Sequence, residues 1–195
     1  IKSDRFYRVY NISSDSDWLI PIQKKIYIRN EQSAIVDVKI DKKKMNKPGL
    51  YNARITATRD DRSKIPEFSM MATEIIPHQF NASNKYKMNW DEHKVDIGMV
   101  ERYFINVPGG QNSMKITLTK NKNDYAFVRY RLFDPNGIEL YLSFSLSSVR
   151  NDELIESYHY DLEPGIYEVI TEGLYVAIGV STYNLSIGFA SIQLL

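Results

Sequence analysis

Three histidines are the residues of this chain best suited to metal binding or proton transfer, because imidazole changes its charge near neutral pH. His78, His93 and His159 stand far apart, without the close spacing that metal ligands usually show. No cysteine is present to add a thiolate ligand. His78 and His93 fall in a polar stretch, where a solvated side chain is the ordinary expectation. The sequence therefore predicts no metal site.

Two segments carry oxygen atoms that calcium could use. Asp15-Ser16-Asp17 starts like a calcium-binding loop, but the later glycine and glutamate of such a loop do not follow. We expect a turn ahead of Trp18 instead. Asp134 and Asn136 could contribute to a calcium site at a loop tip, although a hairpin already accounts for both residues.

The chain lacks the sequence contexts that activate a serine or cradle a phosphate. Gly179-Val180-Ser181-Thr182-Tyr183 has half of a nucleophile elbow, but Tyr183 stands where the second glycine is required. Pro108-Gly109-Gly110 is not followed by the Lys-Ser/Thr pair of a phosphate-binding loop. We predict no catalytic residue, no cofactor-binding residue and no cofactor for this segment.

Exposed aromatic rings could stack on sugars or bases, and a basic patch could bind phosphate. The aromatic candidates are Trp18, Trp90, Tyr130 and Tyr141. A β-sandwich has two inner faces to fill, so buried core positions are favoured for most of them. The charged run Asp41-Lys42-Lys43-Lys44 is interpreted as a solvated turn.

Composition favours strands and argues against charged partners. The 14 Tyr and 8 Phe, with many Val, Ile and Thr, are typical of sheets. A net charge of +1 provides no field that recruits nucleic acid or an anionic membrane, so neither is expected as a partner. The absence of cysteine excludes a disulfide framework and leaves the compartment open.

One short phrase occurs twice, as Lys47-Pro48-Gly49-Leu50-Tyr51 and as Glu163-Pro164-Gly165-Ile166-Tyr167. In each copy the proline fixes φ near the turn value, and the glycine is free to take a positive φ. An alternating strand follows each copy. Two distant copies predict two β-sandwich modules.

The first module is expected over residues 1–79. Its candidate strands are Phe6–Ile12, Lys25–Arg29, Ala34–Ile40, Leu50–Thr58 and Glu67–Ile76. The third strand alternates most clearly, and alternation with one buried face is typical of antiparallel sandwiches. Residues 80–94 are polar without sustained periodicity, which predicts a linker or an edge segment.

The second module is expected over residues 95–195. Asp134-Pro135-Asn136-Gly137 is a strong hairpin signal, because Pro and Gly occupy the positions that a tight turn requires. The candidate strands are Tyr103–Val107, Met114–Leu118, Tyr125–Phe133, Ile138–Ser145, Tyr158–Leu162, Ile166–Thr171, Tyr175–Val180 and Tyr183–Ile192. The predicted fold class is all-β, with two antiparallel β-sandwich modules.

The stretch from Leu174 to Leu195 contains no charged residue and is long enough to cross a bilayer. Polar residues interrupt it, and Leu185, Ile187 and Phe189 repeat every two residues. Two buried strands are therefore expected here rather than a transmembrane helix.

Several signatures in this order resemble the region behind the catalytic domain in the tripeptidyl peptidase II family. In the first half they are Asp17-Trp18, Pro21, Ile26-Tyr27-Ile28, Ile35–Asp41, Gly49-Leu50-Tyr51 and Phe68–Pro77. Met71 departs from the pattern, since the family has a proline there. In the second half Arg102–Gly110 resembles the opening of the family's jelly-roll-like sandwich. This half is also similar to the pre-peptidase C-terminal domain of bacterial secreted proteases.

The resemblance implies a non-catalytic piece of a large subtilisin-like serine peptidase, with a fibronectin-III-like module before a jelly-roll-like one. The apolar pattern at Leu195 and the start at Ile1 also suggest a piece of a longer chain. The family's Asp, His and Ser would lie upstream, so no catalytic residue carries over. Implied partners are the catalytic domain of the same chain and further copies in a homo-oligomer. The implied location is cytoplasmic, with an extracellular one as the alternative.

Two other functions stay open on the sequence alone. One is a secreted-protease accessory module that binds collagen or carbohydrate. The other is a structural or adhesive β-sandwich protein unrelated to proteases.

Overall fold

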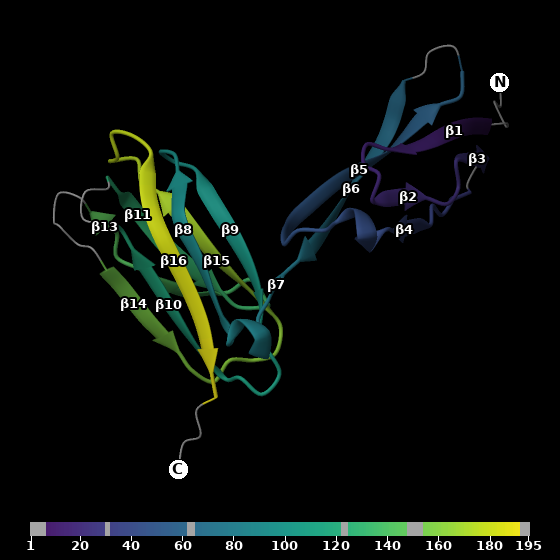
Figure 1. Ribbon diagram of the computed structural model, residues 1–195. Coiled ribbons are helices and arrows are strands. Elements are labelled where there is room, and N and C mark those ends of the chain that lie inside the picture. Colours follow the sequence, from purple (N-terminus) through teal and green to yellow (C-terminus); the bar gives the residue numbers. More distant parts are fainter. Residues whose placement is uncertain (1–6, 30–31, 62–64, 122–124, 148–153, 192–195) are drawn as a thin grey trace. The chain divides into compact units, whose positions relative to one another are not determined.

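The computed structural model describes residues 7–29, 32–61, 65–121, 125–147 and 154–191. The chain divides into two compact units, Ile1–Ile76 and Pro77–Leu195, and each has its own sheets (Figure 1). The predicted all-β, antiparallel fold class is confirmed. The predicted start of the first strand, Phe6, and the predicted end of the last strand, Ile192, lie outside the described residues.

The first unit is built on a four-stranded antiparallel sheet. Its order is β3 (Lys25–Arg29), β1 (Tyr7–Ser14), β5 (Gly49–Arg59), β6 (Pro66–Ile76). A two-stranded sheet of β2 (Leu19–Pro21) and β4 (Val38–Ile40) accompanies it, and the 3₁₀ helix η1 (Lys42–Lys44) follows β4. Trp18 and Leu19 share one apolar core with Tyr10, Ile12 and Ile55, so the small sheet packs on the large one.

The prediction of a third strand over Ala34–Ile40 is mostly wrong. Only Val38–Ile40 forms a strand, and Val38 and Ile40 are 39% and 40% exposed. The partner strand β2 has three residues, and beyond it one more backbone hydrogen bond joins Ile22 N to Asp37 O at 2.9 Å. Ahead of β4, Asp37 also exchanges two hydrogen bonds with the Gln23 side chain, at 2.7 and 2.8 Å.

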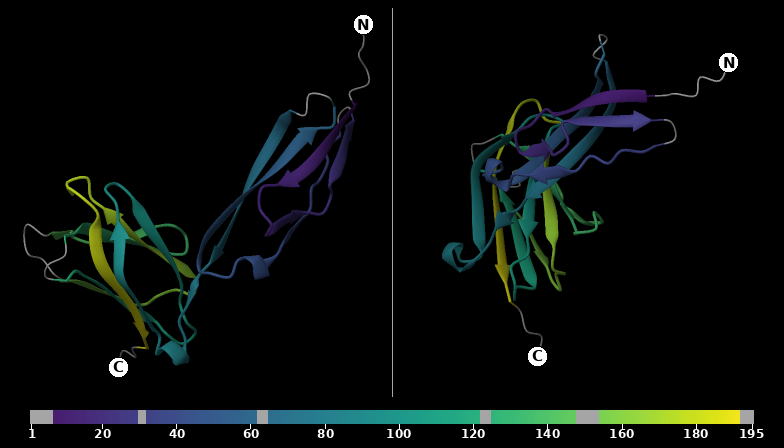
Figure 2. Two further views of the ribbon diagram at one scale, coloured as in Figure 1. Left: turned by 45° about the horizontal axis from the view of Figure 1, so that its top comes forward. Right: turned by 90° about the vertical axis from the view of Figure 1, so that its right-hand side faces the viewer.

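The second unit consists of two sheets that pack face to face (Figures 1 and 2). The β16 sheet has the order β14 (Leu154–His159), β10 (Ser113–Thr119), β16 (Ser181–Ala190), β8 (Lys87–Val95). The β15 sheet has the order β12 (Glu139–Leu142), β11 (Phe127–Phe133), β15 (Ile166–Gly173), β9 (Val100–Asn106), β7 (His78–Gln79), with β13 (Leu146–Ser147) also beside β11. Only the short β7 pairs in parallel among the described strands.

Strict alternation fills the layer between these sheets. Along β16 the inward residues Tyr183, Leu185, Ile187 and Phe189 are buried, whereas the residues between them are only half-buried. β10, β11 and β15 show the same period. Because successive strand residues point to opposite faces, this pattern places one face of each strand in the core and the other in solvent.

Residues 80–94, expected as a linker or an edge segment, belong to the second unit. They hold the 3₁₀ helix η2 (Ala82–Asn84) and most of β8, the edge strand beside β16. Met88 and Trp90 pack against the core at a two-residue spacing. The surrounding polar residues hide this short alternation, because an edge strand has one face and one edge in water.

The predicted strand Tyr175–Val180 is a loop, and the prediction that it is buried is wrong. Tyr175 is 81% exposed and Ile178 is 90% exposed, and the strand starts only at Ser181. The backbone pairing that a strand would need ends before this segment. Leu174 N still donates to Phe127 O at 2.9 Å, but Ala177 N donates to Leu174 O at 3.0 Å, which closes a turn. Among the described residues, no helix has the length and apolarity that a bilayer crossing requires.

Both copies of the repeated phrase build the same backbone device. Gly49 and Gly165 each have φ +149°, as the sequence predicted. The tyrosine two residues later hydrogen-bonds back to the residue before the proline: the Tyr51 hydroxyl donates to Lys47 O at 2.9 Å, and the Tyr167 hydroxyl accepts from Glu163 N at 3.0 Å. Each tyrosine thereby ties the start of a central strand to its preceding turn.

Alanine should cost more at Gly165 than at Gly49. Both positions impose a backbone conformation that costs an L residue about 1–3 kcal/mol. A Cβ at Gly165 would also lie 2.5 Å from Pro135 Cγ, whereas nothing lies within 4 Å of one at Gly49. The clash should add a further ~1–3 kcal/mol.

The unfolding of each unit can be followed by its own tryptophan, because Trp18 lies in the first unit and Trp90 in the second. Urea unfolding of Gly165→Ala is followed through Trp90 in a Trp18→Phe background, and that of Gly49→Ala through Trp18 in a Trp90→Phe background. Equal losses of unfolding free energy would contradict the role given to Pro135.

Candidate functional site

Two of the three histidines lie against one buried tyrosine. The Tyr103 hydroxyl, on β9, lies 2.9 Å from Nδ1 of His93 and 2.9 Å from the Tyr183 hydroxyl. The His78 ring lies 6.4 Å from the Tyr103 ring and meets Trp90 edge-on at 5.0 Å. The expectation of solvated histidines is wrong here, because β7 and β8 carry both rings to the edge of the core.

The tyrosine hydroxyls of this group form a hydrogen-bonded chain, which His78 does not join, since its buried Nδ1 has no hydrogen-bond partner in the described structure. The Tyr183 hydroxyl continues it to Thr171 Oγ1 at 2.7 Å. Burial raises the pKa of Tyr103 and of Tyr183, so both phenols keep their protons. Burial lowers the pKa of His78, which favours its neutral form. The chain thus satisfies polar atoms inside an apolar layer, as buried hydroxyls require.

The third histidine belongs to a second buried chain, which sequence reasoning missed. On β14, His159 Nε2 lies 2.7 Å from Ser157 Oγ, and that hydroxyl also hydrogen-bonds to the Tyr130 hydroxyl. Ser157 is 7% exposed and Tyr130 is fully buried. The signal available in the sequence was the Ser-x-His spacing, since residues two apart share one face of a strand.

A serine hydrogen-bonded to a histidine is the first half of a catalytic triad, but this pair lacks the remaining parts. Among the described residues, no carboxylate hydrogen-bonds to His159, whose other neighbour is the Tyr141 ring at 5.3 Å. Burial lowers the pKa of His159, and the Ser157 hydroxyl is engaged on two sides. The pair therefore has the geometry of a core hydrogen-bond network.

The acidic segments considered for calcium serve local structure. Asp15 Oδ1 accepts from Arg54 N at 2.7 Å, and Asp17 pairs with Lys44 at 3.4 Å. Asp134 Oδ1 accepts from two backbone amides of its hairpin, those of Asn136 at 2.9 Å and Ile138 at 2.7 Å. In the part of the chain that is described, no three His, Asp or Glu side chains come together as a metal group.

The two glycine-containing motifs are also structural. Ser181 is buried at the start of β16, where its hydroxyl accepts from Phe127 N at 2.9 Å. Pro108-Gly109-Gly110 forms a turn that Gln111 N closes onto Pro108 O at 3.1 Å. In the run Asp41–Lys44, Asp41 caps the helix η1, and Lys42 pairs with Glu74 at 3.3 Å.

The aromatic candidates pack into the cores, as expected for most of them. Trp18 is 4% exposed in the first unit and meets Tyr51 edge-on. In the second unit Trp90 and Tyr141 are partly buried against the core that contains Tyr130. None of these four rings is available as a platform on the described surface.

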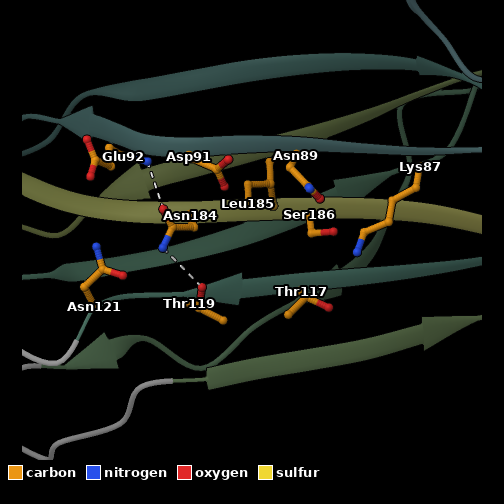
Figure 3. A pocket seen from close by; sticks show the side chains of 10 residues that line it. All are labelled: Lys87, Asn89, Asp91, Glu92, Thr117, Thr119, Asn121, Asn184, Leu185 and Ser186. Carbon is orange, nitrogen blue, oxygen red and sulfur yellow. Dashed lines mark hydrogen bonds between the residues drawn. The ribbon is translucent and has the colours of Figure 1, made fainter. Parts of the chain in front are cut away.

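A polar groove lies on the outer face of the β16 sheet (Figure 3). Its first part has a volume of about 490 Å³, and side chains from β8, β16 and β10 line it. Asn184 stands at its centre: its Oδ1 accepts from Glu92 N at 2.8 Å, and its Nδ2 lies 3.5 Å from Thr119 Oγ1. Glu92 has φ +56° at a register shift between β8 and β16, and Asn184 caps this irregularity.

A second hollow of about 460 Å³ continues this groove on the same sheet. Lys87 lines both hollows, and Gly188 lies opposite Lys87 in the pairing of β16 with β8. Tyr158 and Tyr160 stand at this end, 53% and 58% exposed. Sequence reasoning found neither tyrosine as a surface aromatic.

An apolar surface also forms at one end of the second unit. It consists of the exposed apolar residues of two adjoining loops and of the first residue of β9, and we call it the apolar loop end: Ile97, Met99, Val100, Tyr175, Val176, Ile178 and Val180. The loops touch, since the Tyr175 ring covers Gly98 and Gly98 N bonds to Gly173 O at 2.8 Å. Contiguous exposed apolar residues of this kind mark interaction surfaces.

Lowering the pH should destabilise the second unit through two half-buried histidines, His78 and His159. The folded-state pKa values of His78 and His159 lie below the unfolded value, so the unfolded chain binds protons first as the pH falls below about 6.5. Their stabilising contribution is present above that pH and is lost toward pH 5. Urea unfolding, followed by Trp90 fluorescence, measures how much unfolding free energy is lost as the pH falls to 5. The loss should be smaller in His159→Gln than in the unsubstituted chain, and smaller again in the double variant His78→Gln/His159→Gln. Identical losses in all three proteins would contradict this assignment.

Comparison with known proteins supports the resemblance expected from the sequence. No protein-family model matches the chain. Pyrolysin from Pyrococcus furiosus is 27% identical over 139 residues, which cover 69% of this chain and 9% of pyrolysin. The crystal structure of tripeptidyl peptidase 2 matches with a TM-score of 0.72 at 17% identity, over 97% of this chain and 16% of that one. The chain thus spans a small part of each relative, and it is similar in sequence to part of pyrolysin and in fold to part of tripeptidyl peptidase 2.

Proposed function

We propose that this chain is a non-catalytic accessory region of a large subtilisin-like serine peptidase, in which it supports the catalytic domain and takes part in self-assembly. The observation that carries the proposal is the fold likeness to tripeptidyl peptidase 2 along 97% of the chain. The sequence likeness to pyrolysin agrees with it, since that match also covers a small part of a much longer protein.

The chemistry of such a protein would take place outside the described residues. A subtilisin-like peptidase transfers an acyl group to a serine, with a histidine as base and an oxyanion hole for the developing charge. Here Ser157 and Ser181 are buried and their hydroxyls are engaged with core groups. A supporting role therefore fits these residues better than catalysis.

Two apolar surfaces fit contacts with another part of the parent protein. The apolar loop end is one, with Ile178 90% exposed. The other is a hollow of about 270 Å³ in the first unit, which Ile26, Ile28, Phe68 and Met70 help to line. Surfaces of this kind lose apolar area to a partner on association, and that loss favours binding. The cytoplasmic location expected from the resemblance belongs to this proposal.

The isolated chain should not hydrolyse peptides, and Ser157 should not react with a serine-directed phosphonate probe. The Ser157 hydroxyl is buried between Tyr130 and His159, so the probe has no path to it. Mass spectrometry of the treated chain checks for the adduct, with the full parent peptidase as the positive control. Labelling that disappears in Ser157→Ala would overturn the non-catalytic assignment.

Polar substitutions at the apolar loop end should weaken assembly of the parent protein. In Tyr175→Ser/Ile178→Ser the apolar area available to a partner falls, so sedimentation velocity should show a shift toward smaller species and activity per subunit should drop.

Ile138→Ser is the matched control for this double variant. Ile138 is 60% exposed and lies in the hairpin that follows Phe133. Phe133 is at one end of β11, and the residue that pairs with Gly173 is at the other end. Unchanged sedimentation of the double variant, with unchanged unfolding of the isolated chain, would count against this surface as a contact site.

A further inference from the structure

We infer that the groove on the outer face of the β16 sheet binds a linear, neutral oligosaccharide. The groove comprises both hollows described above, about 490 and 460 Å³, on the described residues of β8, β16, β10 and β14. This binding function is separate from the support of a catalytic domain, and each could hold without the other.

The shape of the groove follows from which residues point outward on each strand. On the central strand β16 the outward residues are small: Asn184, Ser186 and Gly188. At Gly188 the pairing places longer side chains on both sides, Lys87 from β8 and Lys115 from β10. At Gly188 the floor along β16 is therefore low between two longer side chains, and Figure 3 shows side chains from β8 and β10 on either side of β16 at the first hollow. Such a trough admits an elongated ligand.

The lining matches the hydrogen bonds of sugar hydroxyls. Across the rung at Ser186, the register aligns Asn89 on β8 and Thr117 on β10, and all three residues line the first hollow. Their amide and hydroxyl groups offer both donors and acceptors. A sugar hydroxyl can donate and accept at once, so repeated hydroxyls can pair with the first hollow, whereas the second hollow is lined mostly by apolar atoms.

One end of the groove adds aromatic rings. Tyr158 is held in place, because Lys115 Nζ lies 5.2 Å from its ring centre and its hydroxyl donates to Glu156 at 3.2 Å. Lys115 and Glu156 also pair at 2.6 Å. A positioned, half-exposed ring next to polar groups provides an apolar face for the C–H side of a sugar ring.

An extended peptide fits this groove less well. Peptides usually bind sheets by adding a strand at an edge, where free backbone groups meet the ligand. The floor here is β16, which pairs with β8 on one side and β10 on the other. Its backbone groups are thus engaged, and only side chains are available to a ligand.

The test is binding of four neutral probes to the 195-residue chain: cellohexaose, mannohexaose, hexa-N-acetylchitohexaose and maltohexaose. Titration calorimetry gives the affinity, and amide chemical shifts locate the site. We expect at least one probe to bind and to shift the amides of Asn89, Thr117 and Ser186. Ser186→Arg should lower the affinity at least tenfold, because the long side chain fills the floor, and Tyr158→Ala should lower it several-fold.

Thr182→Arg is the matched control. Thr182 lies on the same strand and the same face, two residues beyond Asn184, and it does not line either hollow. This variant should bind the probe as the parent chain does, and urea unfolding should confirm that both arginine variants are folded.

Three results would overturn the inference. The first is that none of the four oligosaccharides binds. The second is that binding survives Ser186→Arg. The third is that a linear peptide of alternating Ser and Ala binds in the groove in place of the sugars. None of these results bears on assembly of the parent peptidase, which the sedimentation experiment tests separately.

Discussion

The apolar layer between the two sheets of the second unit positions everything else that this unit presents. Leu185, Ile187 and Phe189 point into it from β16, and Val128, Tyr130 and Leu132 meet them from β11. Burial of apolar area is the main favourable term in folding. Because side chains alternate along a strand, filling this layer also decides which residues face outward. The polar groove is thus the reverse side of the core.

Polar groups inside that layer are tolerated because they are joined in chains. Tyr103, Tyr183 and Thr171 form one, and Tyr130, Ser157 and His159 form the other. A buried hydroxyl without a partner is costly, whereas a fully paired one is not. Ser157 and His159, which look reactive in isolation, are therefore structural.

The outer surface of the second unit has two distinct characters. The β16 sheet face has one polar hollow and one that is mostly apolar, and it suits a ligand that forms hydrogen bonds and also presents an apolar side. The apolar loop end has no charged residue among its seven members, and it suits a partner that removes apolar area from water. Neither depends on a reactive group. A region that binds and supports, rather than one that catalyses, is consistent with both surfaces.

Local sequence determined the turns and the strong strands. Pro48-Gly49 and Pro164-Gly165 predicted positive φ values, and Lys25–Arg29 has the predicted strand bounds, because these features depend on neighbouring residues alone. Only the tertiary structure decided the pairing of strands. Tyr175–Val180 is an exposed loop because the strands that could pair with it end before this segment. Lys87–Val95 is an edge strand although its sequence pattern is mostly polar. The tertiary structure also places His93 beside Tyr103, and Ser186 beside Asn89 and Thr117. Contacts between such distant residues follow from the register of the sheets, which cannot be predicted from a short stretch of sequence.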